Sequence, residues 1–286
     1  MSDDTEIGDL LKRVARELDT VSESPRLDAE ILLGRAIDMP RAYLFAHPDD
    51  MPDDAAIARL QRTVARRLAG EPMAYITGSK EFWSMDLVVS PATLVPRPET
   101  ELLVDLALRE IPRKAHWRIL DLGTGSGAIA LAIARERPLC DIVAVELSAD
   151  AIRIAEINRR QLDIANVTFL EGSWTAPVAG EGFDLVVSNP PYVKVDDDAL
   201  ERLASEPAAA LVAGVDGLDA IRILAHDCRD VLRVGGQLAL EHGADQEHQV
   251  AKLLRGNGWS EIACHNDYAG LPRVTTARRP APDDEL

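Results

Sequence analysis

The sequence predicts an α/β protein in which a doubly wound parallel sheet follows a small N-terminal helical bundle. Residues 5–70 show helical periodicity throughout, and from Trp117 onward apolar strand-like runs alternate with amphipathic helices. Such alternation is typical of a parallel sheet with helices on both faces. A glycine-rich loop between the first strand and the first helix of this region indicates a ligand-binding edge.

The N-terminal bundle is predicted over residues 1–71 and consists of three amphipathic helices. The second begins with Ser24 as a cap and Pro25 at the first helical position, and the third ends at Gly70. A bundle of this size is either a packing appendage or a docking module for a partner protein. The sequence leaves both interpretations open.

Residues 72–96 are predicted to form a β-hairpin linker. The stretch "MAYITGSKEFWSMDLVVS" alternates in a strand-like way, with Gly78 and Ser79 near the expected turn. Phe82 and Trp83 are expected to pack in the hairpin core and not to contact a ligand. The proline-rich "PATLVPRPETE" that follows is stiff and leads into an acidic helix start.

The α/β domain is predicted over residues 97–280, and residues 281–286 are expected to be a disordered tail. Two strands near the C-terminus, in "SEIACHNDY" and "PRVTTAR", are expected to close one edge of the sheet. The remaining strand candidates are "WRILDL", "DIVAVEL", "VTFLEG", "FDLVVS" and "GGQLALEHG", and the helix candidates are "GAIALAIARER", "SADAIRIAEINRRQL", "GLDAIRILAHDCRDVLR" and "ADQEHQVAKLLRGNG".

The charge balance argues against a nucleic-acid partner. The chain of 286 residues has 31 basic and 48 acidic residues and a formal charge of −17. A phosphate backbone would be repelled unless the basic groups formed one patch, and the densest basic stretch, residues 59–67, is expected to be a solvated helix face.

Cysteine spacing and the N-terminal sequence indicate the cellular compartment. Cys140, Cys228 and Cys264 are far apart without a CxxC pair, so neither a disulfide framework nor a zinc site is expected, and the histidines show no metal spacing. The acidic start "MSDDTEIGDL" is unlike a signal peptide, and no apolar run is long enough to span a bilayer. A cytoplasmic location away from membranes is therefore expected.

The glycine loop lies in "ILDLGTGSGAIALAIA", where Gly123, Gly125 and Gly127 separate a strand from a helix. Glycines there let the backbone approach a ligand and aim helix N-terminal amides at it. Because Ala128 follows, the loop also satisfies the dinucleotide fingerprint, and NAD is an alternative ligand. Glu146, at the end of the next strand, can accept both ribose hydroxyls of either NAD or S-adenosylmethionine.

Two features favour S-adenosylmethionine over NAD. Asp121 precedes the glycines, and a second site follows the fourth strand in "VSNPPY". A planar nitrogen with a delocalised lone pair is a poor nucleophile, so a catalyst that methylates one must orient it and accept its hydrogens as positive charge develops. Asn189 and the Pro190 carbonyl can supply those acceptors, Pro191 stiffens the turn, and the Tyr192 ring can close against a flat group.

A family resemblance supports this chemistry. The segments "DLGTGSGAIALA", "VSNPPYV", "LVPRPETE", "YITGSKEFWSMDLVVSPATL", "EPAAAL" and "LEHGADQ" resemble the PrmC/HemK family of glutamine N5-methyltransferases over roughly residues 5–278. The resemblance implies a class I, Rossmann-like methyltransferase domain and S-adenosylmethionine as donor, with S-adenosylhomocysteine as product. It also implies that the acceptor is the glutamine of the Gly-Gly-Gln motif in peptide chain release factors.

The resemblance and the residue chemistry together assign a predicted site without a metal. Glu146 stands where many members of the family have Asp, which is expected to shift donor affinity and not to abolish it. Donor-binding residues are predicted to be Asp121, Gly123, Thr124, Gly125, Ser126, Gly127, Glu146, Trp174 and Asn189. Substrate-binding residues are predicted to be Leu94, Arg97, Glu99, Asn189, Pro190, Pro191 and Tyr192, with Asn189, Pro190 and Tyr192 catalytic.

Several alternatives stay open on the sequence. Arg97 and Glu99 could be only a charge pair at a helix start, and Trp174 could be a half-buried tryptophan beside a loop. The same Asn-Pro-Pro-Tyr tetrad resembles that of adenine N6 and guanine N2 methyltransferases, which would make the substrate a nucleic acid. A non-catalytic donor-binding adaptor is the alternative from another class. His242 is interpreted as structural, because methyl transfer to an amide does not require a base.

Overall fold

The structure is a computed structural model in which residues 6–281 are described. The chain forms two compact units, Met1–Thr77 and Gly78–Leu286, each with its own core. Of the predicted tail, only Ala281 lies among the described residues, so the prediction for the rest falls outside them. None of the helices formed by residues 6–281 is long and apolar enough to cross a bilayer.

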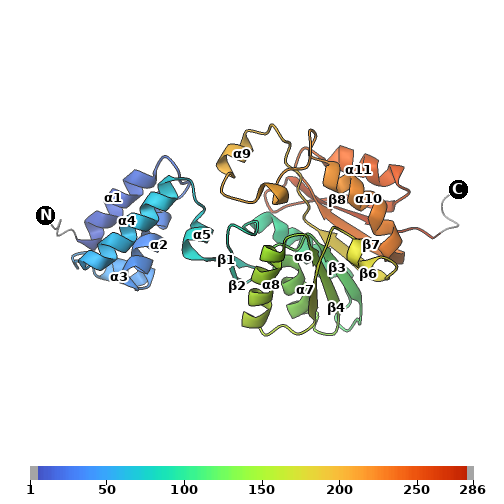
Figure 1. Cartoon of the computed structure of the whole chain (residues 1–286), viewed down its shortest axis with the longest axis horizontal. Coiled ribbons are helices and arrows are strands. Elements are labelled where there is room, and N and C mark those ends of the chain that lie inside the picture. The colour runs from blue at the N-terminus through green and yellow to red at the C-terminus, as the bar shows by residue number, and fades with distance from the viewer. Residues whose placement is uncertain (1–5, 282–286) are drawn as a thin grey trace. The chain divides into compact units, whose positions relative to one another are not determined.

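The first unit is a helical bundle (Figure 1). Its core is built from leucine, isoleucine, valine and alanine side chains that recur at helical spacing. Glu30 is buried inside it and is held by ion pairs to Arg26 at 2.7 Å and Arg41 at 2.6 Å, which keep the pKa of Glu30 low despite burial. The helices are α1 (Ile7–Leu18), α2 (Pro25–Ile37), α3 (Arg41–Ala46), α4 (Asp54–Leu68) and α5 (Met73–Thr77).

Two of these helices differ from the sequence prediction. The short helix α3 was not predicted. The strand-like alternation expected after Pro72 is wrong for residues 73–77, which form α5, with the amides of Tyr75 and Ile76 donating to the Pro72 carbonyl. An apolar run of five residues fits a helical turn as well as a strand, and proline before the first turn favours the helix.

The second unit begins with an antiparallel hairpin of β1 (Ser79–Phe82) and β2 (Met85–Val88). Its turn is at Trp83 and Ser84, whose φ angles of 51° and 53° give the left-handed backbone that suits a two-residue hairpin. The turn expected near Gly78 and Ser79 is present at Gly78, but it precedes β1 and does not join the two strands. Phe82 is buried in the core, and Trp83 packs against it.

A seven-stranded sheet has the order β5-β4-β3-β6-β7-β9-β8, parallel except for β9, which runs antiparallel to β7 and β8 (Figure 1). This confirms the predicted mostly parallel α/β fold. The strands are β3 (Arg118–Leu122), β4 (Asp141–Glu146), β5 (Val167–Glu171), β6 (Phe183–Ser188), β7 (Leu232–Glu241), β8 (Ser260–Asn266) and β9 (Pro272–Arg278). The helices are α6 (Glu101–Glu110), α7 (Ala128–Glu136), α8 (Ala149–Gln161), α9 (Ala199–Arg202), α10 (Asp219–Val231) and α11 (Glu247–Gly256), with 3-10 turns η1 (Pro98–Thr100), η2 (Ala176–Val178) and η3 (Ala208–Ala210).

Alternate residues of each central strand face two separate cores. In β3, Ile119 belongs to the core that α6 and α7 cover, whereas Leu120 and Leu122 belong to the core that α10 and α11 cover. The register pairs Leu122 with Val145 and with Ser188. The ends of β3, β4 and β6 therefore meet at one edge, and the segments that follow them form the candidate site.

Asn158 of α8 fastens the hairpin to the glycine loop. It is fully buried, its Oδ1 accepts from the Val88 amide at 2.7 Å, and its Nδ2 donates to the carbonyls of Val88 at 3.0 Å and Ser126 at 2.9 Å. Both polar atoms of the side chain are hydrogen-bonded, so Asn158 links the hairpin to the glycine loop.

We predict that Asn158→Ala lowers the free energy of unfolding by about 3 kcal/mol, because three buried hydrogen bonds are lost and backbone groups remain unpaired. Urea unfolding followed by circular dichroism measures this. Gln161→Ala, on the exposed part of the same helix, is the control and should change stability by less than about 0.5 kcal/mol. Equal changes in the free energy of unfolding for the two substitutions would contradict this role of Asn158.

Candidate active site

The glycine loop connects β3 to α7 and is closed by Glu146. Gly125 has φ of 57°, a left-handed conformation that glycine adopts without strain, and its amide donates to Glu146 Oε2 at 2.9 Å. Glu146 Oε1 accepts from the Ser148 amide at 2.9 Å. The carboxylate at the end of β4 is thus held by two backbone amides on the same side of the sheet edge as the loop.

Asp121 lies beneath the loop and is completely buried. Its Oδ2 accepts from Thr124 Oγ1 at 2.6 Å and from the Ala130 amide at 3.2 Å, whereas Oδ1 has no hydrogen-bond partner among the described residues. Burial raises the pKa of Asp121 to about 7, with a smaller contribution from the negative charge of Glu146. A buried acceptor without a partner is costly, which makes Asp121 a candidate for contact with a ligand donor.

The other small residues of the loop have packing contacts. Thr124 and Ser126 are buried, Thr124 bonding Asp121 and Ser126 offering its carbonyl to Asn158. At Gly127, with φ of 84°, a Cβ would approach Leu131 at 3.0 Å. These residues shape the loop from within.

A cavity of about 300 Å³ lies at this edge of the second unit. Its walls combine loop backbone, the Glu146 carboxylate and the Trp174 side chain with residues that follow β6. Of the predicted site residues, Leu94, Gly123, Gly125, Glu146, Trp174, Asn189 and Pro191 line it. The lining among the described residues does not include Arg97, Glu99, Asp121, Thr124, Ser126, Gly127, Pro190 or Tyr192.

The tetrad follows β6, whose last residue is tied to β3 by a hydrogen bond from Ser188 Oγ to the Leu122 carbonyl at 2.7 Å. Asn189 Nδ2 donates to Thr100 Oγ1 at 3.1 Å. The amide nitrogen is therefore engaged away from the cavity that Asn189 lines, and its Oδ1 is the end available to a ligand. Pro190 is buried.

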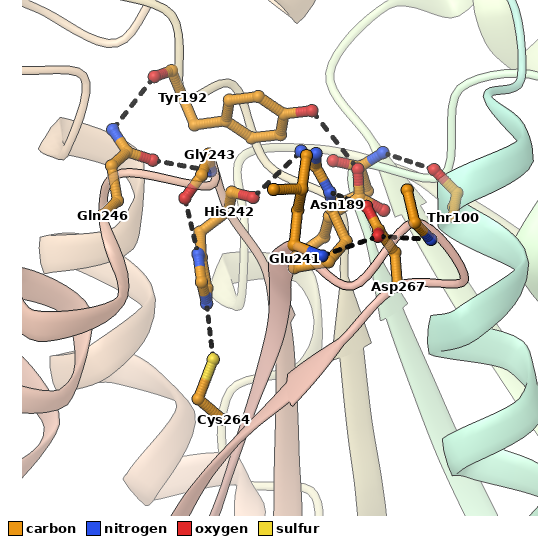
Figure 2. A network of polar contacts seen from close by, with 12 residues as sticks. Thr100, Asn189, Tyr192, Glu241, His242, Gly243, Gln246, Cys264 and Asp267 are labelled. Carbon is orange, nitrogen blue, oxygen red and sulfur yellow. Dashed lines mark hydrogen bonds and ion pairs between the residues drawn. The ribbon is translucent and has the colours of Figure 1, made fainter.

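Tyr192 is fixed at both ends (Figure 2). Its hydroxyl donates to Glu241 Oε1 at 3.3 Å, and its backbone carbonyl accepts from Gln246 Nε2 at 3.1 Å. Burial, followed by the negative charge of Glu241, raises the pKa of Tyr192, so the phenol stays protonated. The ring that the sequence predicted to close on an amide is held in one orientation.

Glu241 and Thr100 lie beside the tetrad and were not named by the sequence interpretation. Glu241 ends β7, is 1% exposed, and has one oxygen, Oε2, without a hydrogen-bond partner among the described residues. Burial raises the pKa of Glu241 to about 7, against the opposing effect of the nearby Thr100 hydroxyl. A signal was present, since Glu241 is an acidic residue at the end of an otherwise apolar strand, in "LEHG".

The segment before α6 and the loop before α10 are joined by a buried ion pair. Arg97 Nη2 contacts Glu206 Oε1 at 2.5 Å, and Glu206 Oε2 accepts from the Val95 amide at 3.0 Å. Glu99, by contrast, is exposed. The alternative of a simple Arg97 and Glu99 charge pair does not describe Arg97, whose partner lies 109 residues away in the sequence.

His242 has the contacts of a structural residue. It is fully buried, with Nδ1 2.9 Å from the Gly243 carbonyl and Nε2 2.8 Å from Thr275 Oγ1. Burial lowers its pKa and keeps the ring neutral. No group of three or more potential metal ligands occurs within residues 6–281.

Comparison with known proteins identifies the family. A family model of the PrmC N-terminal domain matches residues 9–78, and one of a methyltransferase domain matches residues 113–267. A release factor glutamine methyltransferase from Coxiella burnetii is 46% identical over 273 residues, covering 96% of this chain and 99% of its own length. One from Xylella fastidiosa is 48% identical over 257 residues, covering 89% and 94%.

The chain belongs to the release factor glutamine methyltransferase family. The predicted resemblance is thereby confirmed. A crystal structure of a methyltransferase from Pyrococcus furiosus shares the fold, with a TM-score of 0.54 at 19% identity, over 77% of this chain and 100% of its own. The methyltransferase domain match indicates a reaction class other than NAD-dependent hydride transfer.

In this family member, the Arg97 and Glu206 pair should hold the loop that closes the cavity, since Pro207, Ala209 and Ala210 beside Glu206 line it. We predict that Arg97→Ala destabilises the chain by about 2 kcal/mol, because it leaves the carboxylate of Glu206 buried without its partner, while the one-third exposure of Arg97 limits the loss.

Hydrogen exchange read by mass spectrometry should also show faster exchange in residues 199–211 of Arg97→Ala. The control is Lys194→Ala, which removes an exposed ion pair with Asp245 and should cost less than about 0.5 kcal/mol. Unchanged exchange in residues 199–211 of Arg97→Ala would show that the ion pair does not hold the loop.

Proposed function

We propose that this chain transfers the methyl group of S-adenosylmethionine to the side-chain amide nitrogen of the glutamine in the Gly-Gly-Gln motif of peptide chain release factors. Family membership supports the reaction class. The observation that carries the proposal is the orientation of Asn189, whose nitrogen is engaged by Thr100 and whose oxygen is left for the cavity. That arrangement suits an acceptor that has hydrogens to donate.

The residues present fit the donor. The Glu146 carboxylate, held by two amides, is placed to accept ribose hydroxyls, and Trp174 provides an apolar wall for an adenine. Asp121 has the unpartnered buried oxygen expected beneath a cationic ligand. When bound, S-adenosylmethionine supplies a methyl group on a positively charged sulfur that a weak nucleophile can attack.

The chain's own part in the reaction is to hold and orient the acceptor. A primary amide nitrogen has its lone pair delocalised, so it needs a fixed approach and acceptors for its two hydrogens as charge develops. Asn189 Oδ1 accepts one of them, and the Pro190 carbonyl is the proposed acceptor for the other. Tyr192, held by Glu241 and Gln246, limits water access beside them.

Substrate class is tested by incubating the chain with methyl-labelled donor and, separately, a release factor, its Gln→Ala variant in the Gly-Gly-Gln motif, tRNA, rRNA or DNA. Label in the release factor alone, lost in the variant, is the expected result. Label in a nucleic acid and not in the release factor would favour the amine methyltransferase alternative, against which the formal charge of −17 argues.

We predict that Asn189→Ala reduces kcat by about a hundredfold or more, because an acceptor aligned with the reacting nitrogen is lost. The dissociation constant of S-adenosylmethionine, measured by calorimetry, should change little. Asn266→Ala, at an exposed position on β8, is the matched control and should keep full activity. Full activity of Asn189→Ala would instead support an adaptor or a different acceptor.

We predict that Glu146→Ala raises the dissociation constant of the donor about tenfold to a hundredfold, since hydrogen bonds to a charged group are worth about 1.5–3 kcal/mol. Calorimetry without acceptor measures this directly. Asp141→Ala changes the exposed residue at the other end of the same strand and should leave the affinity unaltered. An unaltered affinity in Glu146→Ala would remove this carboxylate from the donor site.

A further inference from the structure

Three segments distant in sequence converge on the side chain of Asn189. Thr100 ends the turn η1, Asn189 follows β6, and Glu241 ends β7. Thr100 Oγ1 accepts from Asn189 Nδ2 at 3.1 Å and lies close enough to the Glu241 carboxylate to lower its pKa, and Glu241 Oε1 accepts from Tyr192. Figure 2 shows Asn189, Thr100 and Tyr192 gathered around Glu241 at the ends of these strands.

We propose that Thr100 and Glu241 are positioning residues that fix the Asn189 amide with its oxygen toward the acceptor. The inference rests on the proposed function, in which Asn189 Oδ1 accepts a hydrogen of the substrate amide. Neither residue need touch the substrate, because both act through Asn189.

The physical basis is the single proton of the Thr100 hydroxyl. While Glu241 is ionised, it can only accept, and its negative charge attracts the hydroxyl hydrogen of the neighbouring Thr100. Thr100 Oγ1 then offers only lone pairs to Asn189, which must present its NH₂ group to Thr100 and its oxygen to the cavity. Hydrogen bonds in such a chain also polarise one another, which increases the negative charge on Asn189 Oδ1.

Protonation of Glu241 removes the attraction that directs the Thr100 hydroxyl hydrogen to the carboxylate. A neutral carboxyl can donate to Thr100, which frees the threonine hydrogen to bond the Asn189 oxygen and allows the amide to turn. The charged and titratable groups that face Glu241 are Glu99, which raises its pKa, and Arg273, which lowers it, together with the protonated Tyr192 phenol. His242, its neighbour on the chain, is neutral because burial lowers its pKa.

The sign of the pH dependence follows. Because burial raises the pKa of Glu241 to about 7, the carboxylate is ionised above that pH and protonated below it. The value of kcat at saturating donor should therefore rise through about pH 7. Asp121 also has a pKa of about 7, but the proposed function assigns it to donor binding, so saturating donor separates its effect on the pH profile from that of Glu241.

The test measures kcat and KM of the full chain with a release factor as acceptor and S-adenosylmethionine as donor, from pH 5.5 to about 9. Thr100→Val should lower kcat about tenfold or more with little change in KM, because the acceptor is misoriented and not lost. Thr100→Ser, which keeps the hydroxyl, should stay within about threefold of wild type. Glu241→Gln should remove the rise of kcat near pH 7.

Thr276→Val is the matched control. It makes the same change at another buried threonine, one that bonds His265 and the Ala263 carbonyl outside this network, and should leave kcat and the pH profile unaltered. Wild-type kcat in Thr100→Val, or a rise of kcat near pH 7 that persists in Glu241→Gln, would overturn the proposal. If Thr100→Val does not fold, the pH profile of Glu241→Gln and the activity of Thr100→Ser decide.

A second measurement does not depend on activity. It therefore distinguishes a failure of the proposed function from a failure of the proposed positioning of Asn189 by Thr100 and Glu241. Side-chain ¹⁵N-asparagine labelling, with the Asn189 signal assigned by its loss in Asn189→Ala, follows the NH₂ group by NMR. The expected shift with pH has a midpoint near the pKa of Glu241, about 7, and disappears in Thr100→Val. An Asn189 signal insensitive to pH would overturn the positioning role of Thr100 and Glu241 even in an active enzyme. An inactive wild type whose Asn189 signal titrates as expected would overturn only the proposed function.

Discussion

In the proposed reaction, the hydrogen bond from Asn189 Nδ2 to Thr100 Oγ1 decides which end of the Asn189 amide faces the substrate. An amide side chain has a donor end and an acceptor end of almost the same shape, so packing alone distinguishes them poorly. The choice has to come from a neighbour of fixed polarity. In this structure that neighbour is a threonine beside a buried carboxylate, and the fold as a whole brings the three groups together.

The cavity edge collects carboxylates, and each is accommodated in a different way. Glu206 is paired with Arg97, and Glu146 accepts two backbone amides. Asp121 and Glu241 each keep one oxygen without a hydrogen-bond partner among the described residues, and burial raises the pKa of each to about 7. Because an unpaired buried charge is expensive, these two are the groups whose state a ligand or a change of pH can alter most readily.

Sequence patterns predicted most of the fold because its elements are long and strongly periodic. The strands from β3 to β9 and the long helices of the second unit were expected from alternation of apolar runs with amphipathic ones. The short helix α3 and the five residues of α5 were not, since a run of that length has too few periods to distinguish helix from strand. Composition predicted the turn at Gly78 that precedes β1, whereas the turn between β1 and β2, at Trp83 and Ser84, contains no glycine and is shown by the strand pairing.

The candidate site was predictable where function depends on local motif chemistry and unpredictable where it depends on contacts between distant segments. Asn189 and Glu146 were found from their places at strand ends. The functions of Thr100 and Glu241 could not be assigned, because a threonine in "PRPETE" and a glutamate in "LEHG" gain meaning only when the sheet order sets β7 beside β6.

The motifs that carry the family resemblance are also segments that contact one another beside the cavity. "PRPETE" supplies Arg97 and Thr100, "EPAAAL" supplies Glu206, and "LEHG" supplies Glu241. Arg97 binds Glu206, while Thr100 lies close to Glu241 and orients Asn189 of the tetrad. Each of these contacts therefore joins residues of two different motifs. A substitution in one motif should change the energetic effect of a substitution in its contact partner, and this coupling is a physical reason for the motifs to occur together in one chain.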